Sequence, residues 1–145
     1  MKYLIVEAGA QLPEEMNAFF KQAEAVSFSG KNFRKRFIIR SGNKFQVKPV
    51  REVSYFFADG KEVYLVSKAD NRKYIIDYSL DDLQQVVDPD VFFRVNRKFL
   101  VCVDCIQEVK SLSNGTLELK LNQTCDHELF VSRDRANNFK TWLDR

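Results

Sequence analysis

The chain has 145 residues, the length of one domain of ordinary size. Hydrophobic residues make up 45% of it and aromatic residues 13%, enough to bury a core without disulfides or a structural metal. The net charge is +3, the three cysteines are an odd number, and no apolar run approaches the ~20 residues of a membrane span. The composition therefore argues against a disulfide scaffold or a membrane protein, and for a soluble protein of the cytoplasm.

Residues 1–32 differ from the rest of the chain. After Pro13, a short helix is predicted to carry Met16, Phe19, Phe20 and Ala23 at helical spacing. A small, polar hinge follows up to Asn32. We expect this part to be a linker helix and hinge, or the remnant of a connection to an upstream domain. It is too short to be a domain itself. The first residues hold an apolar run too short for a signal peptide.

A basic stretch follows the hinge. Residues 31–48 contain no acidic residue and seven basic ones, which are Lys31, Arg34, Lys35, Arg36, Arg40, Lys44 and Lys48. Lys and Arg displace counterions from phosphates, so a stretch of this kind suits a polyanion. Charge is also a common protection for the edge strand of a sheet. The charge pattern by itself leaves both interpretations open.

From Phe33 the hydrophobic period becomes two, which predicts strands. The first strand is expected over Phe33–Arg40, and the turn residues Ser41–Lys44 predict a hairpin. Further strands are expected over Val50–Ala58, Glu62–Lys68 and Lys73–Asp77. Asp59-Gly60 is the strongest local turn signal in the chain.

The second half begins with a helix signal. Ser79 is a predicted N-cap, with Leu80 and Leu83 on one helix face before Pro89. Strands are then expected within Phe92–Val103 and over three further segments, Ile106–Leu112, Leu117–Leu121 and Leu129–Val131, with a turn at Asn114-Gly115. Ser132 is expected to cap a final helix that carries Ala136, Phe139 and Leu143.

These elements sum to eight to ten short strands, one short internal helix and one C-terminal helix. No alternation of strand and helix, as in a parallel α/β sheet, is visible. The pattern predicts a mainly β fold, either a sandwich or a set of packed sheets.

Catalysis and metal binding find little support. The sequence has no Gly-rich phosphate loop, and its one histidine, His127, lies in a polar turn where a general base is not expected. Cys102 and Cys105 have the spacing of a zinc knuckle, and Cys125 and His127 bring the number of candidate ligands to four. In a regular strand, however, residues three apart face opposite sides. We therefore expect no enzyme, no metal and no cofactor.

Nucleic-acid binding has the most support among the residues. Within Phe92–Val101, aromatic and aliphatic residues surround Arg94, Asn96, Arg97 and Lys98. Arg reads guanine and Asn reads adenine through paired hydrogen bonds in the major groove. Arg133 and Arg135 begin the last helix, where free backbone N–H groups favour a phosphate. A charged strand face and a plain helix cap are the alternatives for these two places.

The chain resembles the LytTR family of bacterial DNA-binding domains. Phe92–Val101 is similar to the family phrase FFRVHRSYLVN, and Leu129–Arg133 resembles its VSRRY ending before a short helix. Val53–Ala58 and Tyr78–Leu83 resemble the family's early strand and internal helix. The resemblance extends from about residue 33 to residue 143, which makes residues 33–145 the expected DNA-binding domain.

The resemblance implies an elongated stack of small antiparallel sheets that uses loops to enter successive major grooves. It implies that base edges are read by Asn96, Arg97 and Arg133, and that Lys61, Lys98 and Arg135 contact the DNA backbone. Family members often have His at the position of Asn96 and Ser at that of Lys98, so the DNA sequence read by this chain stays open.

The implied partners are double-stranded DNA with promoter repeats, an upstream receiver domain and its sensor kinase, with two copies pairing on DNA. The chain is thus predicted to be the output domain of a two-component response regulator that controls transcription. The alternative is a β-rich protein-interaction module whose basic face binds an acidic partner without any DNA role. Little affinity for DNA even at low salt would indicate the alternative.

Overall fold

A computed structural model describes residues 32–144 of the chain. The linker helix and hinge expected over residues 1–32 therefore lie outside the described residues, apart from Asn32. The described part begins with a hairpin of two strands, β1 (Arg36–Ser41) and β2 (Lys44–Pro49), which pair antiparallel.

The middle of the chain forms a five-stranded antiparallel sheet with the strand order β5-β4-β3-β7-β6. Its strands are β3 (Val53–Asp59), β4 (Glu62–Ser67), β5 (Lys73–Ile76), β6 (Phe92–Arg94) and β7 (Phe99–Cys102). A short 3-10 helix, η1 (Val50–Glu52), precedes β3, and helix α2 (Leu80–Val86) connects β5 to β6.

The last part of the chain forms a three-stranded antiparallel sheet with the order β10-β9-β8. Its strands are β8 (Ile106–Ser111), β9 (Leu117–Leu121) and β10 (Leu129–Val131), and helix α3 (Arg133–Leu143) follows them. A second 3-10 helix, η2 (Val103–Cys105), lies between β7 and β8 and thus joins the two larger sheets.

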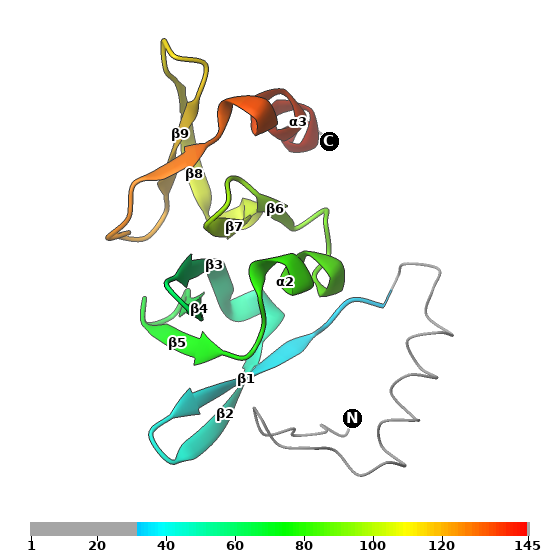
Figure 1. Cartoon of the computed structure of the whole chain (residues 1–145), viewed down its shortest axis with the longest axis vertical. Coiled ribbons are helices and arrows are strands. Elements are labelled where there is room, and N and C mark those ends of the chain that lie inside the picture. Colours follow the sequence, from blue (N-terminus) through cyan, green and yellow to red (C-terminus); the bar gives the residue numbers. More distant parts are fainter. Residues whose placement is uncertain (1–31, 145) are drawn as a thin grey trace.

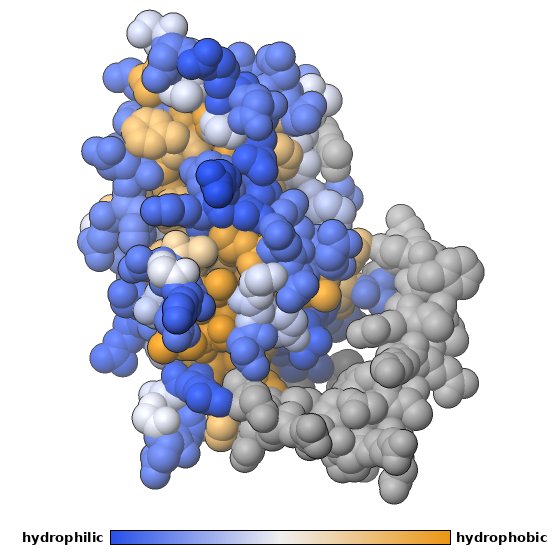
Figure 2. Space-filling view, viewed as in Figure 1, coloured by the Kyte–Doolittle hydropathy of each residue, from blue (hydrophilic) through white to orange (hydrophobic). Residues whose placement is uncertain are grey.

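Figure 1 shows the sheets arranged along the long axis of the molecule. The β1–β2 hairpin lies at one end, the five-stranded sheet and α2 lie in the middle, and the three-stranded sheet and α3 lie at the other end. Polar side chains cover most of the face seen in Figure 2, and apolar surface runs between them over the middle of the molecule. The expected fold class, a mainly β stack of small antiparallel sheets with an internal and a C-terminal helix, is confirmed.

The core is centred on β3, the middle strand of the largest sheet. Because successive side chains of a strand point to opposite faces, Phe56 and Phe57 enter different layers, and both are buried. Phe56 packs edge-on against Phe37 of the hairpin, with ring centroids 5.3 Å apart. On the other face, Phe57 stacks on Phe99 of β7 at 5.9 Å. A strand covered on both faces explains why its sequence is a continuous apolar run.

Two predicted strands begin later than expected. Residues 33–35 precede β1 because the backbone N–H of Arg34 donates to the carbonyl of Val86, the last residue of α2, at 2.7 Å. Val50–Glu52 was expected as strand and forms η1, closed by a hydrogen bond from the Val53 N–H to the Val50 carbonyl. In both places a hydrogen bond outside the ladder competes with the strand, and a period-two pattern does not reveal it.

Turns and caps follow their local signals with one exception. Gly60 turns the chain between β3 and β4 with a φ of +63°, a region that glycine enters without steric cost. Ser79 caps α2, and its hydroxyl accepts from the Asp82 N–H at 3.0 Å, as predicted. Ser132 occupies the N-cap of α3, but its side chain makes no capping bond. Its hydroxyl instead accepts from Arg135 Nη1 at 3.5 Å.

Candidate nucleic-acid interface

The three segments expected to contact DNA lie side by side. Backbone hydrogen bonds join them: the Ala58 N–H donates to the Lys98 carbonyl at 2.9 Å, and the Ser132 N–H donates to the Val95 carbonyl at 3.0 Å. We call the hairpin turn 59–62, the loop 95–98 and the junction 132–135 together the three-loop surface. Segments that are some 35 residues apart in sequence are thus joined into one surface by hydrogen bonds between main-chain atoms.

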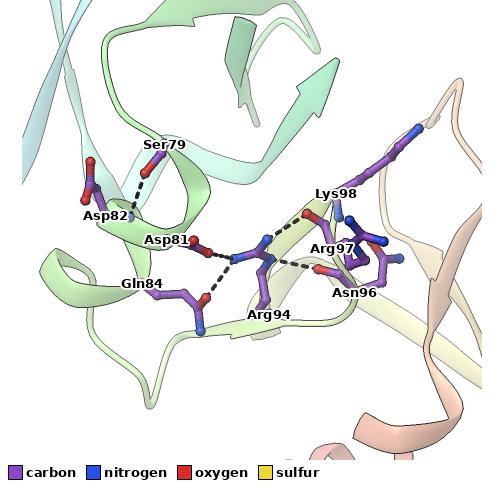
Figure 3. A network of polar contacts seen from close by, with 8 residues as sticks. All are labelled: Ser79, Asp81, Asp82, Gln84, Arg94, Asn96, Arg97 and Lys98. Atoms are coloured by element: carbon purple, nitrogen blue, oxygen red, sulfur yellow. Dashed lines mark hydrogen bonds and ion pairs between the residues drawn. The ribbon is translucent and has the colours of Figure 1, made fainter. Parts of the chain in front are cut away.

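Arg94 holds the central loop of this surface in place (Figure 3). Its Nε donates to the Asn96 carbonyl at 2.7 Å, and Nη2 donates to the Arg97 carbonyl at 2.6 Å. Nη1 donates to Asp81 at 3.0 Å and to Gln84 at 2.7 Å, both on α2. The guanidinium fork therefore connects the loop to α2 with hydrogen bonds from a charged donor, which are stronger than neutral ones.

Only 12% of the Arg94 side chain is exposed, against 88% of its partner Asp81. The largely buried cation is compensated by a carboxylate at the surface, and four of its five N–H donors are already used by the protein. Arg94 is therefore a positioning residue for the loop. The sequence showed Arg94 within the basic centre of Phe92–Val101 but gave no signal that its guanidinium turns inward.

Asn96 is also engaged within the chain. Its Nδ2 donates to the carbonyl of Phe130 on β10 at 2.7 Å, and its Oδ1 accepts from the Lys98 N–H at 2.8 Å. The side chain thus ties the loop to the three-stranded sheet and closes a tight turn within the loop. One amide hydrogen and one oxygen lone pair stay unused. Base reading by Asn96 stays a prediction, and this geometry favours a positioning role.

Arg97 and Lys98 are exposed, in contrast to the two residues that support them. In Figure 3 the Lys98 side chain extends away from Arg94 and α2. Lys61, in the neighbouring hairpin turn, is exposed as well and stands between the acidic residues Asp59 and Glu62. Arg97, Lys98 and Lys61 are therefore cations that can meet a ligand without rearrangement of the backbone.

The junction at the start of α3 supplies two more cations. Arg133 is exposed, and its side chain lies over the Asn114-Gly115 turn, where a Cβ on Gly115 would be 3.1 Å from Arg133 Cγ. Gly115 has a φ of +88°, so only glycine both accepts this backbone and leaves room for the arginine. Arg135 is half-buried and directed to Ser132.

An acidic wall borders the three-loop surface on one side. A groove of ≈ 650 Å³ is lined by Lys61 and Arg97 and by three carboxylates of α2 and the segment before it, those of Asp77, Asp81 and Asp82. Carboxylates repel phosphates, so a polyanion on the three-loop surface is kept off this side. Acidic residues in the first turn of a helix complement its dipole, so the sequence alone does not reveal that Asp81 and Asp82 border the basic loops.

The positions of two cysteines differ from those expected from the sequence. Cys102 and Cys105 were expected on opposite sides of a strand, but β7 ends at Cys102 and η2 brings both thiols to one side. Cys125 lies elsewhere, with its thiol donating to the Tyr55 hydroxyl at 3.4 Å. Among residues 32–144, no three His, Cys, Asp or Glu side chains gather in a way that could hold a metal ion. His127 lies in a loop, as expected, with its ring 4.4 Å from that of Phe57.

Comparison with known proteins identifies the family. The family model for the LytTr DNA-binding domain matches residues 43–144. The chain belongs to the LytTR family of DNA-binding domains. No curated protein matches the sequence.

A solved structure shares the fold of this LytTR domain. It is the LytTr DNA-binding domain of a protein from Bacillus cereus described as a methyl-accepting/DNA response regulator, with 21% identity and a TM-score of 0.69. The match covers 77% of this chain and 99% of the other. LytTR is a family of DNA-binding domains and not of enzymes, which agrees with the interpretation of the loops. Within the described residues, no helix is long and apolar enough to cross a membrane.

Proposed function

We propose that this LytTR domain binds double-stranded DNA sequence-specifically and is the output domain of a response regulator that controls transcription in the cytoplasm. The observation that carries the proposal is the three-loop surface. It presents Lys61, Arg97, Lys98 and Arg133 on three segments that main-chain hydrogen bonds hold together. Exposed cations on a rigid base suit a regular array of phosphates and base edges.

Within this surface the roles divide by position. Arg97 and Arg133 read base edges, because both are long, exposed donors on segments fixed through their backbone. Lys61, Lys98 and Arg135 contact phosphates and set the orientation of the domain. Asn96 supports Arg97 and Lys98 through its own hydrogen bonds, and any contact with a base would use its remaining amide hydrogen.

The wider context of the proposal concerns residues outside the described structure. Residues 1–32 connect this domain to a receiver domain, which a sensor kinase phosphorylates, and residues 33–145 form the DNA-binding unit. Two copies bind adjacent promoter repeats. The response-regulator context of the B. cereus protein supports this assignment by similarity.

Selection of binding sites from a random duplex library, at near-physiological salt, tests the proposal. We expect enrichment of two short repeats about one helical turn apart. Binding to one selected site should weaken steeply as salt rises, since phosphate contacts release counterions. No enriched sequence, together with little affinity for DNA at low salt, would instead indicate a protein-interaction module.

A further inference from the structure

Two cysteines lie in the segment that connects the five-stranded sheet to the three-stranded sheet. Cys102 is the last residue of β7 and the N-cap of η2, Cys105 is the last residue of η2, and β8 begins at the next residue. Side chains three positions apart in a 3-10 helix lie over each other. The two thiols are therefore neighbours, and both are free.

The surroundings of the pair distinguish the two sulfurs. Ser54, in the bulge of β3, is fully buried, and its hydroxyl lies beside Cys105 without a regular hydrogen-bond partner. The neighbouring Cys102 thiol, with help from Ser54 and the Lys68 ammonium, lowers the pKa of Cys105 to about 6 against the opposing effects of burial and Asp104. The same contact and burial raise the pKa of Cys102. Of the two thiols, Cys105 is therefore the more acidic and Cys102 the less acidic.

A cavity gives small molecules a path to this place. Cys102 forms part of the wall of a cavity of ≈ 400 Å³, with Phe33, Val50 and Phe92 among its apolar lining residues and Arg51 and Lys68 among its cations. Cys102 is 2% and Cys105 4% exposed, so the thiols are closed to another protein chain. A small reagent that enters the cavity meets the pair from the side of Cys102. With another protein chain excluded, each cysteine has only the other as a partner for a protein disulfide.

We propose that Cys102 and Cys105 are a modification site at which hydrogen peroxide converts the two thiols into an intramolecular disulfide. The site is independent of the DNA-binding proposal, because it needs only the fold around η2. The disulfide would close a four-residue loop between β7 and β8, at the connection between the two larger sheets.

The reaction needs no reagent besides the peroxide. The Cys105 thiolate attacks one peroxide oxygen, the O–O bond breaks, and the released hydroxide takes the proton lost from Cys105 to form water. The Cys102 sulfur then attacks the Cys105 sulfur, the S–O bond breaks, and the departing hydroxide takes the Cys102 proton as a second water. Two electrons pass from the two sulfurs to one molecule of peroxide.

Trypsin makes the product easy to identify. Cleavage after Lys98 and Lys110 gives a peptide, residues 99–110, that contains Cys102 and Cys105, whereas Cys125 lies in the peptide of residues 121–133. The full chain would be treated with hydrogen peroxide, its remaining thiols alkylated, and its peptides analysed by mass spectrometry. We expect peptide 99–110 to lose two hydrogen atoms and escape alkylation, while Cys125 is alkylated. Alkylation of both cysteines in peptide 99–110, under conditions that oxidise glutathione, would overturn the proposal.

Two variants test the order of events. In Cys102→Ser the reaction should stop at a Cys105 sulfenic acid, which a 1,3-dione captures, and in Cys105→Ser no sulfenic acid should be captured. Capture at Cys102 and not at Cys105 would overturn the assignment. Cys125→Ser is the matched control and should oxidise like the unchanged protein.

A measurement on the unchanged protein tests the proposal even if the cysteine variants fail to fold. The rate of alkylation at Cys105, assigned by fragment ions within peptide 99–110, should be half-maximal near pH 6, below the value of about 8.5 for an ordinary thiol. Faster alkylation at Cys102 than at Cys105 would contradict the proposal, since the nucleophile would then be the wrong sulfur.

Discussion

Nη2 of Arg94 donates a hydrogen bond of 2.6 Å to the main-chain carbonyl of Arg97. Two arginines three residues apart therefore have opposite tasks: Arg94 is directed inward and fixes the loop, and Arg97 is exposed at its tip. Because Arg94 already orders the loop in the free protein, less conformational entropy is lost when DNA binds.

Arg94→Lys should lower both stability and DNA affinity. Lysine keeps the charge but cannot reach the carbonyls of Asn96 and Arg97 together with α2, so that several hydrogen bonds from a charged donor are lost. We expect a loss of about 2 kcal/mol in the free energy of unfolding, measured by urea denaturation. Affinity should fall alike for all DNA sequences, because the loop is loosened as a whole. Asp81→Asn is the control: it removes only an exposed partner, and an equally large loss there would contradict the role given to the loop carbonyls.

Arg97→Ala and Lys98→Ala should change DNA binding in different ways. If Arg97 reads a base edge, its removal costs about 1–3 kcal/mol on the preferred site and less on other sequences, so the preference at one base pair relaxes. Removal of Lys98 should weaken every sequence alike and reduce the slope of log affinity against log salt by about 1. Titrations of both variants on one selected site and its single-base variants check this. Equal losses on every sequence for both variants would refute the assignment.

Asn96→Ala tests whether this residue positions the loop or reads DNA. Loss of its hydrogen bonds to Phe130 and Lys98 should destabilise the fold by about 1–2 kcal/mol. Binding should weaken for all sequences, with the base preference unchanged in a repeated site selection. A changed preference at a single base pair, with unchanged stability, would show that Asn96 reads a base.

Gly115→Ala should impair DNA binding from outside the three loops. The φ of +88° costs an alanine about 1–2 kcal/mol, and the new Cβ would lie 3.1 Å from Arg133 Cγ, which must move. Gly42→Ala is a matched control, with a φ of +66° and no heavy atom within 4 Å of the new Cβ. Both variants should lose stability, and only Gly115→Ala should also lose affinity in a DNA titration. Equal affinities would remove Arg133 from the interface.

Phe37→Ala tests whether β1 belongs to the folding unit, since the family match begins only at residue 43. Phe37 is 1% exposed and contacts Phe56 at the centre of the core, so its truncation should cost about 3–5 kcal/mol. Phe45→Ala in the same hairpin removes a half-buried ring and should cost clearly less. Similar small losses for both, in thermal unfolding, would mean that the hairpin is an appendage.

Local signals predicted the elements of the fold well. Periodicity located the strands, Asp59-Gly60 and Asn114-Gly115 located turns, and Ser79 located the start of α2, because each depends on residues that are close in sequence. The late start of β1 was missed because it depends on a hydrogen bond to a distant segment, from Arg34 to Val86. The late start of β3 was missed because a period-two pattern does not reveal the 3-10 turn η1.

The residues of the candidate site were likewise predicted only in part. The sequence identified the exposed cations Lys61, Arg97 and Arg133 by type and position. It did not identify Arg94 as their support, because the direction of its guanidinium depends on α2, which contributes Asp81 and Gln84 from thirteen and ten residues away. It also separated Cys102 from Cys105, since strand geometry was assumed where a 3-10 helix forms.

The main-chain hydrogen bonds from Ala58 to Lys98 and from Ser132 to Val95 do not depend on which side chains those positions carry. Residues at the tips of the three loops can therefore be exchanged with little effect on folding, while Arg94 and Asn96 must be kept. A domain built in this way can change the DNA that it binds through single substitutions that leave its fold stable. Related LytTR domains can thus diverge in the DNA they bind and still inherit the same scaffold.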